Sequence, residues 1–123
     1  MTTSKSNTDT FFDGISSVDM LKELVRRGGH PGALAEACLL TVKKSQDYNR
    51  GLGFEDIHNV DRSSYFPFGT VSYAQMLHTK AKRFNSLTLA ELQGQDANHE
   101  GLRDTALDII NYAGFFAAEY SSK

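Results

Sequence analysis

The chain has 123 residues and a mass of 13.6 kDa, the size of one ordinary domain. A formal net charge of −2 and a single cysteine exclude a strongly basic surface for genomic nucleic acid, an internal disulfide framework and a cysteine-rich zinc site. No segment approaches the roughly 20 consecutive apolar residues that span a bilayer. We therefore expect a cytoplasmic protein without a membrane contact, built as a flexible polar arm (residues 1–14) followed by one domain (residues 15–123).

The first predicted helix is bounded by a capping serine and a pair of glycines. Ser16 is a favoured N-cap residue ahead of the amphipathic run VDMLKELVRR. The pair Gly28-Gly29 is typical of the residues that end a helix. These signals predict a helix over residues 17–27.

The second predicted helix begins at a proline. Pro31 fits the first turn of a helix, where the missing N–H is not needed. Leu34, Cys38 and Val42 then share one side at about 100° per residue. The pattern predicts a helix over residues 31–47 and places Cys38 in the core.

A long connection over residues 48–70 follows, with glycines and a proline but no sustained apolar period. Connections of this length in compact domains are usually functional or disordered. Tyr65, Phe66 and Phe68 argue against disorder, because aromatic side chains are depleted in disordered segments. We expect an ordered lid or rim.

Two further helices are predicted over residues 71–88 and 99–120, with a polar connection at 89–98. The apolar stripe expected to face the core in the last helix comprises Leu102, Ala106, Ile109, Ala113, Phe116 and Tyr120. Leu107 and Phe115 lie opposite this stripe, so the helix is expected to be buried on two sides. Because no segment has a strand pattern, the fold class is all-α. We expect a four-helix bundle-like domain with a long ordered loop between its second and third helices.

Three acidic residues share one face of the last helix. Glu100, Asp104 and Asp108 follow one another at intervals of four residues, and like charges at this spacing destabilise an isolated helix. A compensating cation is therefore expected, either Mg²⁺ or the side chain of a lysine or arginine. The simpler alternative is an ordinary solvated face, with the first acids stabilised by the helix dipole.

Two bases border the core-facing side of the third predicted helix. Lys80 and Arg83 either extend to solvent along apolar surface or face the acids of the last helix. Bases and acids that face each other on packed helices suit a phosphate held through a metal ion. We expect Lys80 and Asp104 to point into one cleft. Asp47, at the start of the long loop, is a further candidate.

Three segments resemble a known family. KKSQDY at 43–48, TKAKRFNSL at 79–87 and HEGLRDTALDIINYA at 99–113 are similar, in order and spacing, to motifs of the phage and bacterial nucleotide-modification-associated domain of the first type. The matched positions are Lys44, Asp47, Tyr48, Lys80, Arg83, Glu100, Asp104, Asp108 and Tyr112.

The resemblance implies a protein that handles nucleotides. The family is similar in outline to the all-α MazG-like nucleotide pyrophosphatases, in which helix-borne carboxylates hold Mg²⁺ against a triphosphate. By this resemblance Glu100, Asp104 and Asp108 are metal ligands. Asp47, Tyr48, Lys44, Lys80, Arg83 and Tyr112 are ligand-binding residues.

Two functions from different classes follow from the resemblance. The first is a phage-type, Mg²⁺-dependent enzyme that hydrolyses or modifies free nucleotides in the host cytoplasm. The second is a non-catalytic protein that sequesters a nucleotide or a cyclic, nucleotide-derived immune signal, which is an anti-defence role. The second helix lacks the E-E-x-x-E cluster of MazG proteins and carries only Glu36, which favours binding without turnover. A helical oligomerisation module is the third alternative.

The helices are apolar on more than one side. Leu39 and Leu40 extend the apolar surface of the second helix beyond the face that contains Leu34. A chain this short cannot cover all of these faces, so we expect a homo-oligomer, most simply a dimer with helices packed across a two-fold axis.

Overall fold

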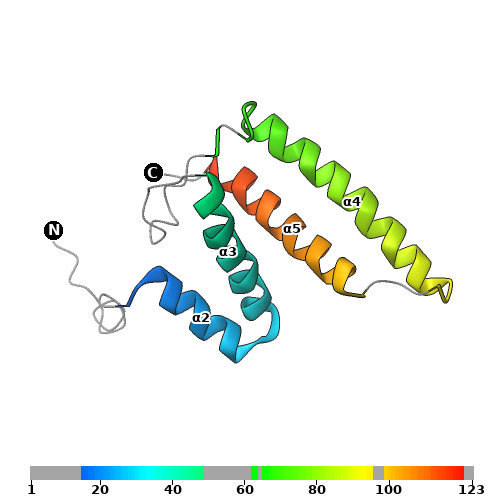
Figure 1. Ribbon diagram of the computed structural model, residues 1–123, viewed down its shortest axis with the longest axis horizontal. Coiled ribbons are helices and arrows are strands. Elements are labelled where there is room, and N and C mark those ends of the chain that lie inside the picture. Colours follow the sequence, from blue (N-terminus) through cyan, green and yellow to red (C-terminus); the bar gives the residue numbers. More distant parts are fainter. Residues whose placement is uncertain (1–14, 49–61, 64, 96–98, 121–123) are drawn as a thin grey trace.

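The computed structural model describes residues 15–48, 62–63, 65–95 and 99–120 (Figure 1). Four α-helices occupy these ranges, and no strand occurs in them. They are α2 (Ser17–Arg27), α3 (Gly29–Tyr48), α4 (Thr70–Leu92) and α5 (His99–Ala118). The all-α class and the bundle-like arrangement are confirmed. The expected N-terminal arm and residues 49–61 of the long loop lie outside the described ranges.

α2 begins and ends where its capping residues predict. The backbone N–H of Asp19 donates a 3.1 Å hydrogen bond to Oγ of Ser16, which satisfies one of the free donors of the first turn. At the other end the N–H of Gly28 donates to the carbonyl oxygens of Leu24 and Val25. Because Gly28 and Gly29 have φ values of 78° and 67°, residues with a Cβ would be strained in this turn.

Helix α4 is longer than its sequence pattern predicts. We expected residues 89–98 to be a polar connection, but Leu89 and the three residues after it continue the helix. Leucine, alanine and glutamate all have high helix propensity, which explains the extra turn. The helix is closed by Gly94 at φ 74°, whose N–H donates to the carbonyl oxygen of Glu91.

The helices form two hairpins, α2–α3 and α4–α5, which are joined by the contact between α3 and α5. α2 packs on α3, α3 packs on α5, and α5 packs on α4. In the described part of the chain α4 contacts neither α2 nor α3, so α5 lies between α3 and α4 (Figure 1). The C-terminal ends of α3 and α5 lie close together, and α4 runs antiparallel to α5.

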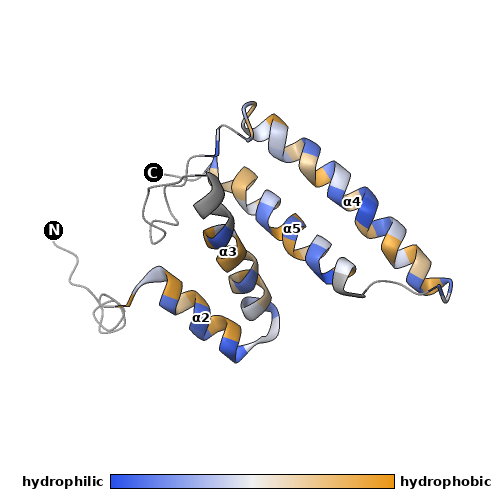
Figure 2. Ribbon diagram, in the orientation of Figure 1, coloured by the Kyte–Doolittle hydropathy of each residue, from blue (hydrophilic) through white to orange (hydrophobic). Residues whose placement is uncertain are grey.

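The core is small and is formed by residues of α3, α4 and α5. The buried side chains in the described ranges are Ala35, Ala37 and Thr41 of α3, Tyr73 of α4, and Thr105 and Leu107 of α5. Hydropathy along the ribbon is mixed on every helix (Figure 2). Burial of α5 on two sides is confirmed, because Thr105 and Leu107 are each 3% exposed.

The predicted core stripe of α5 was partly wrong. Ala113 is exposed, Tyr120 is 71% exposed, and Ile109 and Phe116 are only half-buried. The stripe marks a continuous apolar side of the helix, but α3 and α4 approach α5 from either edge of that side. Burial therefore falls on Thr105 and Leu107 instead of on its centre.

The described part of the long loop ends in an aromatic cluster. Phe66 lies 5.2 Å from the ring of Tyr73 and 5.9 Å from that of Tyr112, measured between ring centroids. The ring of Phe115 contacts the same two tyrosines, with its centroid 5.5 Å from that of Tyr73 and 6.0 Å from that of Tyr112. Offset and edge-on ring pairs at these separations are favourable. This aromatic cluster fastens the loop to the start of α4 and the second half of α5. Phe68, in contrast, is 75% exposed.

None of the described helices combines the length and the apolar character needed to cross a membrane.

Gly32 is required by the close approach of α2 and α3. A Cβ at this position would stand 3.0 Å from the backbone oxygen of Leu24, whereas a Cβ at Gly114 on α5 would meet nothing within 4 Å. We predict that Gly114→Ala raises the free energy of unfolding by about 1 kcal/mol through helix propensity. Gly32→Ala should show none of this gain, because the backbone of α2 has to move. Urea unfolding followed by circular dichroism measures the free energy of unfolding of both variants. Equal changes in the two variants would contradict the close approach of Gly32 to the backbone of α2.

An ion pair joins α3 to α5. Arg103 donates through both terminal guanidinium nitrogens to the Glu36 carboxylate, with Nη2 at 2.8 Å from Oε1. The hydrogen bonds from Arg103 hold the pKa of Glu36 below its ordinary value. The side chains are 33% and 57% exposed, so solvent screens the pair and we expect only a small coupling free energy.

The contribution of Glu36 to stability depends on pH. Since its pKa is lower in the folded state than in the unfolded state, the contribution is present above about pH 4.3, the ordinary value, and is lost as pH falls through the lowered pKa. A double-mutant cycle of Glu36→Gln and Arg103→Gln should show a favourable coupling near neutral pH and none in strong acid. A coupling free energy that is the same at neutral pH and in strong acid would refute the ion pair.

Candidate functional site

The packing of α4 against α5 brings the predicted bases onto the predicted acids. Lys80 of α4 reaches Asp108 of α5, with Nζ at 3.1 Å from Oδ2. A step of three residues along α4 gives Arg83, whose Nε donates a 3.3 Å hydrogen bond to Oγ1 of Thr105, three residues back along α5. The two helices therefore keep one antiparallel register across the site.

The Lys80–Asp108 pair is partly shielded from water. The side chains are 25% and 22% exposed, so each keeps a path to solvent while its neighbours exclude part of its hydration. The sequence left open whether Mg²⁺, lysine or arginine compensates the acidic face, and for Asp108 the structure provides a lysine. Asp108 also has further interactions within the structure.

Asp104 differs from Asp108 in its surroundings. It lies one helical turn, about 6 Å, nearer the start of α5 and is exposed. We expected Lys80 to share a cleft with Asp104, but its ion-pair partner is Asp108. The charge of Asp104 instead contributes to raising the pKa of Arg103, behind the larger effect of Glu36.

The third predicted metal ligand, Glu100, is the second residue of α5, and its side chain is not described. In the ranges that the structure describes, no group of three histidine, cysteine, aspartate or glutamate side chains is placed to hold a metal ion. Carboxylate oxygens are nonetheless the donors that Mg²⁺ takes, commonly one or two together with substrate phosphates and water. Asp104, which is exposed, fits that role.

Thr105 positions Arg83 beside these acids. Its hydroxyl donates 2.7 Å to the carbonyl oxygen of Gly101, which leaves an oxygen lone pair for Nε of Arg83. Thr105 itself is buried, whereas Arg83 is exposed. The guanidinium is thus held at its Nε edge on a residue that stays exposed. Thr105 was not among the predicted site residues, although it directly follows Asp104.

The predicted site residues of α3 belong to the end of that helix. Lys44, Asp47 and Tyr48 occupy the last turns of α3, and their side chains are outside the described set. Glu36, whose carboxylate binds Arg103, stands eleven residues before Asp47, about 16 Å along the helix. The predicted role of Asp47 therefore stays a prediction.

Tyr112 belongs to the aromatic cluster, one turn beyond Asp108. Two polar neighbours there were not predicted as site residues. The guanidinium carbon of Arg62 lies 3.9 Å from the centre of the Phe115 ring, a cation–π contact. The Nδ2 of Asn111 is buried and has no hydrogen-bond partner among the described residues. The loop around Arg62 has no periodicity, so its sequence gave no signal for this contact.

Cys38 is half-buried on α3. Burial raises the pKa of its thiol, and the positive charge of Arg62 and a hydrogen bond involving Thr41 oppose that shift. A raised pKa keeps the thiol protonated and unreactive at neutral pH. The expectation of a structural cysteine agrees with this environment.

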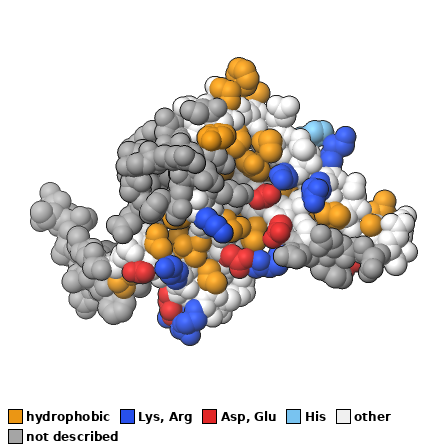
Figure 3. All heavy atoms as spheres, viewed as in Figure 1, with side chains coloured by type: hydrophobic (Ala, Val, Ile, Leu, Met, Phe, Trp, Pro, Cys, Tyr) orange, Lys and Arg blue, Asp and Glu red, His pale blue; other side chains and the backbone are white. Residues whose placement is uncertain are grey.

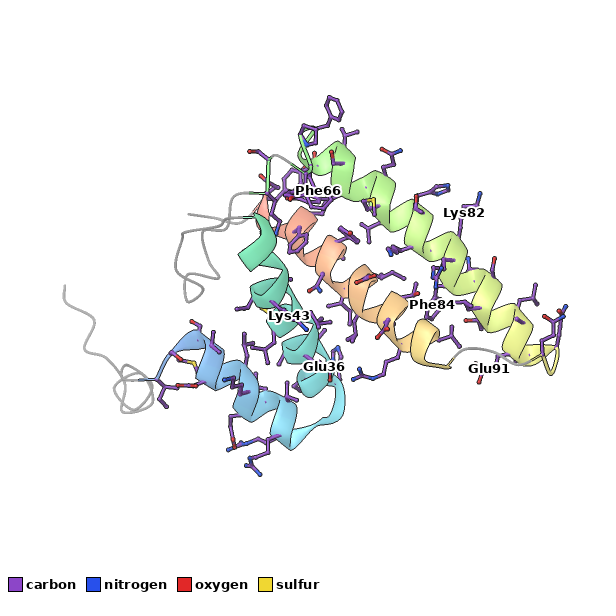
Figure 4. All side chains as sticks on the ribbon, in the orientation of Figure 1. Glu36, Lys43, Phe66, Lys82, Phe84 and Glu91 are labelled. Atoms are coloured by element: carbon purple, nitrogen blue, oxygen red, sulfur yellow. The ribbon has the colours of Figure 1, made fainter. Side chains whose placement is uncertain are left out.

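Charged side chains of both signs lie next to one another across the middle of the face shown in Figure 3. In Figure 4, Phe66 lies where the start of α4 approaches the end of α5, and Lys82 points away from α5. The bases of α4 thus divide into Lys80 and Arg83, which contact α5, and Lys82, which does not.

The chain matches no family model, and comparisons with curated proteins and with solved structures gave no match either. The nucleotide-related resemblance therefore stays a prediction.

Asp108 and Asp104 offer a matched test of the ion pair. Asp108→Asn leaves the partly buried ammonium of Lys80 without its counter-charge, so we predict a loss of about 1–2 kcal/mol in the free energy of unfolding. Asp104→Asn is the same chemical change one turn away at an exposed position, and should stay within about 0.5 kcal/mol of the parent. Equal losses in urea unfolding would contradict the assignment of Lys80 to Asp108.

Proposed function

We propose that this protein binds free nucleotides through their phosphates at the junction of α4 and α5, and hydrolyses them with Mg²⁺. The observation that supports this best is the Lys80–Asp108 contact, with exposed Asp104 one turn away and Arg83 one turn along α4. Cationic donors and carboxylates thereby share one face. Phosphate oxygens bind to cationic donors, and Mg²⁺ binds to carboxylate oxygens.

The residues divide naturally between charge neutralisation and metal binding. Arg83 is exposed, and Nε is the one nitrogen seen to bind Thr105, so its terminal nitrogens suit a bidentate contact with phosphate oxygens. Asp104 and Glu100 would hold Mg²⁺, which supplies Lewis-acid polarisation of the phosphoryl group and an activated water when bound. Lys80 is positioned to exchange its contact with Asp108 for one with phosphate.

A second function is favoured by the same ion pair. Asp108 is already neutralised by Lys80, which removes one carboxylate from the expected set of metal ligands. A site of this kind suits retention of a nucleotide, or of a cyclic nucleotide-derived signal, without turnover.

Mass spectrometry distinguishes the two functions. The protein would be incubated with the ribo- and deoxynucleoside triphosphates and with cyclic mono- and dinucleotides, with and without Mg²⁺. Hydrolysed products that require Mg²⁺ support the enzyme, and unaltered nucleotide released on denaturation supports the binding protein. If neither product nor bound nucleotide is found, the nucleotide proposal is wrong.

For the nucleotide identified in this way, we predict that Asp104→Asn weakens Mg²⁺-dependent binding or turnover at least tenfold. The reason is that the variant removes a metal-binding charge from an exposed position without disturbing packing. Glu119→Gln is the matched control, since it removes one exposed charge just beyond the end of α5. If the two variants have the same effect in titration calorimetry or turnover assays, Asp104 is not a metal ligand.

A further inference from the structure

One face of α4 carries seven exposed side chains in a regular pattern. We call it the α4 seam. Its members are Val71, Ala74, His78, Ala81, Asn85, Leu89 and Leu92. They follow one another at intervals of three or four residues, so at helical pitch they fall within an arc of about 80°. The seam lies roughly 130° around the helix from the side that contacts α5, so α5 leaves it uncovered.

The large side chains of the α4 seam are among the most exposed apolar groups of the described structure. Val71 is 67% exposed, Leu89 is 55% exposed and Leu92 is 79% exposed. Figure 3 shows hydrophobic side chains protruding at the end of the molecule where α4 begins. By contrast Leu39 and Leu40, expected from the sequence to widen an exposed apolar surface, are half-buried.

The α4 seam is complementary to itself when two copies run antiparallel. With the two-fold axis between positions 81 and 82, Val71 faces the second copy's Leu92, and Ala74 faces its Leu89. Ala74 with Leu89 sets a small side chain against a large one, and Val71 with Leu92 sets two branched apolar side chains together. His78 faces Asn85, and these two side chains carry complementary hydrogen-bond donors and acceptors. Three pairings thus join seam positions to one another under the two-fold axis, as in an isologous contact, and Ala81 comes level with Lys82 at the edge of the seam.

Charge also favours a second copy as the occupant. The α4 seam contains no lysine, arginine, aspartate or glutamate, so self-pairing buries no unpaired formal charge. Lys82 lies at its edge and can extend to solvent. An antiparallel pair also sets the helix dipoles in opposite directions. A parallel pair would instead place Leu92 on Leu92 and His78 on His78, without the small-to-large match.

The available area is sufficient for a dimer. Full burial of an aliphatic side chain removes on the order of 100 Å² of apolar surface from water. Val71, Leu89 and Leu92 of both copies, with the exposed Phe68 just before α4 and the smaller side chains between them, approach the roughly 1,000 Å² total of a specific interface. We propose that the α4 seam is the two-fold contact of a homodimer, with α4 antiparallel to its counterpart.

The mass in solution tests the location of the contact. We expect light scattering to give twice 13.6 kDa for the parent at micromolar concentration. Leu89→Glu should raise the dimer dissociation constant at least tenfold, whereas Ser86→Glu, an exposed control on the same helix but outside the α4 seam, should leave it unchanged. A monomeric parent, or a Leu89→Glu variant that dimerises like the control, overturns the proposal.

Cross-linking tests the orientation. In a Cys38→Ala background, Ala81→Cys should form a disulfide with its own copy, because position 81 lies beside the axis. Leu92→Cys should cross-link to Val71→Cys in a mixture but not to itself, because two copies of position 92 would be about 30 Å apart along the helices. Self-linkage of Leu92→Cys indicates a parallel pair and overturns the antiparallel contact.

Discussion

The antiparallel register between α4 and α5 is the constraint on which the rest of the described structure depends. Tyr73 meets Phe115 at one end, and seven residues further along α4 Lys80 meets Asp108, seven residues back along α5. The same register sets Arg83 against Thr105. A slip of one turn would separate the aromatic rings and both polar contacts together, so these interactions hold one another in place.

Local signals in the sequence were sufficient for much of the fold. Ser16 and the two glycines at 28 and 29 define α2 because capping and positive φ are properties of single residues and their immediate neighbours. The end of α4 was misjudged, since the segment after residue 88 is polar enough to resemble a connection but consists of good helix formers. The exposure of Ala113 was also missed, because periodicity gives the apolar side of a helix and not the direction of its neighbours.

The sequence predicted which types of residue meet at the candidate site, but not which individual residues pair with each other. That bases of one helix would meet acids of another followed from their places on the two helical faces. Which acid Lys80 would meet depends on how far α4 slides along α5, and neither helix encodes that distance by itself. Asp108 is the partner because the aromatic rings at the other end fix the slide. Arg62 could not be foreseen at all, since its contact with Phe115 comes from a segment without a repeating pattern.

The central place of α5 has a consequence for the order of folding. Among the described helices, the two hairpins meet only through α5, and α5 follows the other three along the chain. During synthesis, α2 and α3 can pack together as soon as both have left the ribosome. The side of α4 that packs on α5 stays uncovered until α5 has been made. The newly made chain therefore exposes the apolar side of α4 for the time needed to add about 30 more residues, at 5–20 residues per second. A chaperone that binds apolar helices has its opportunity in that interval.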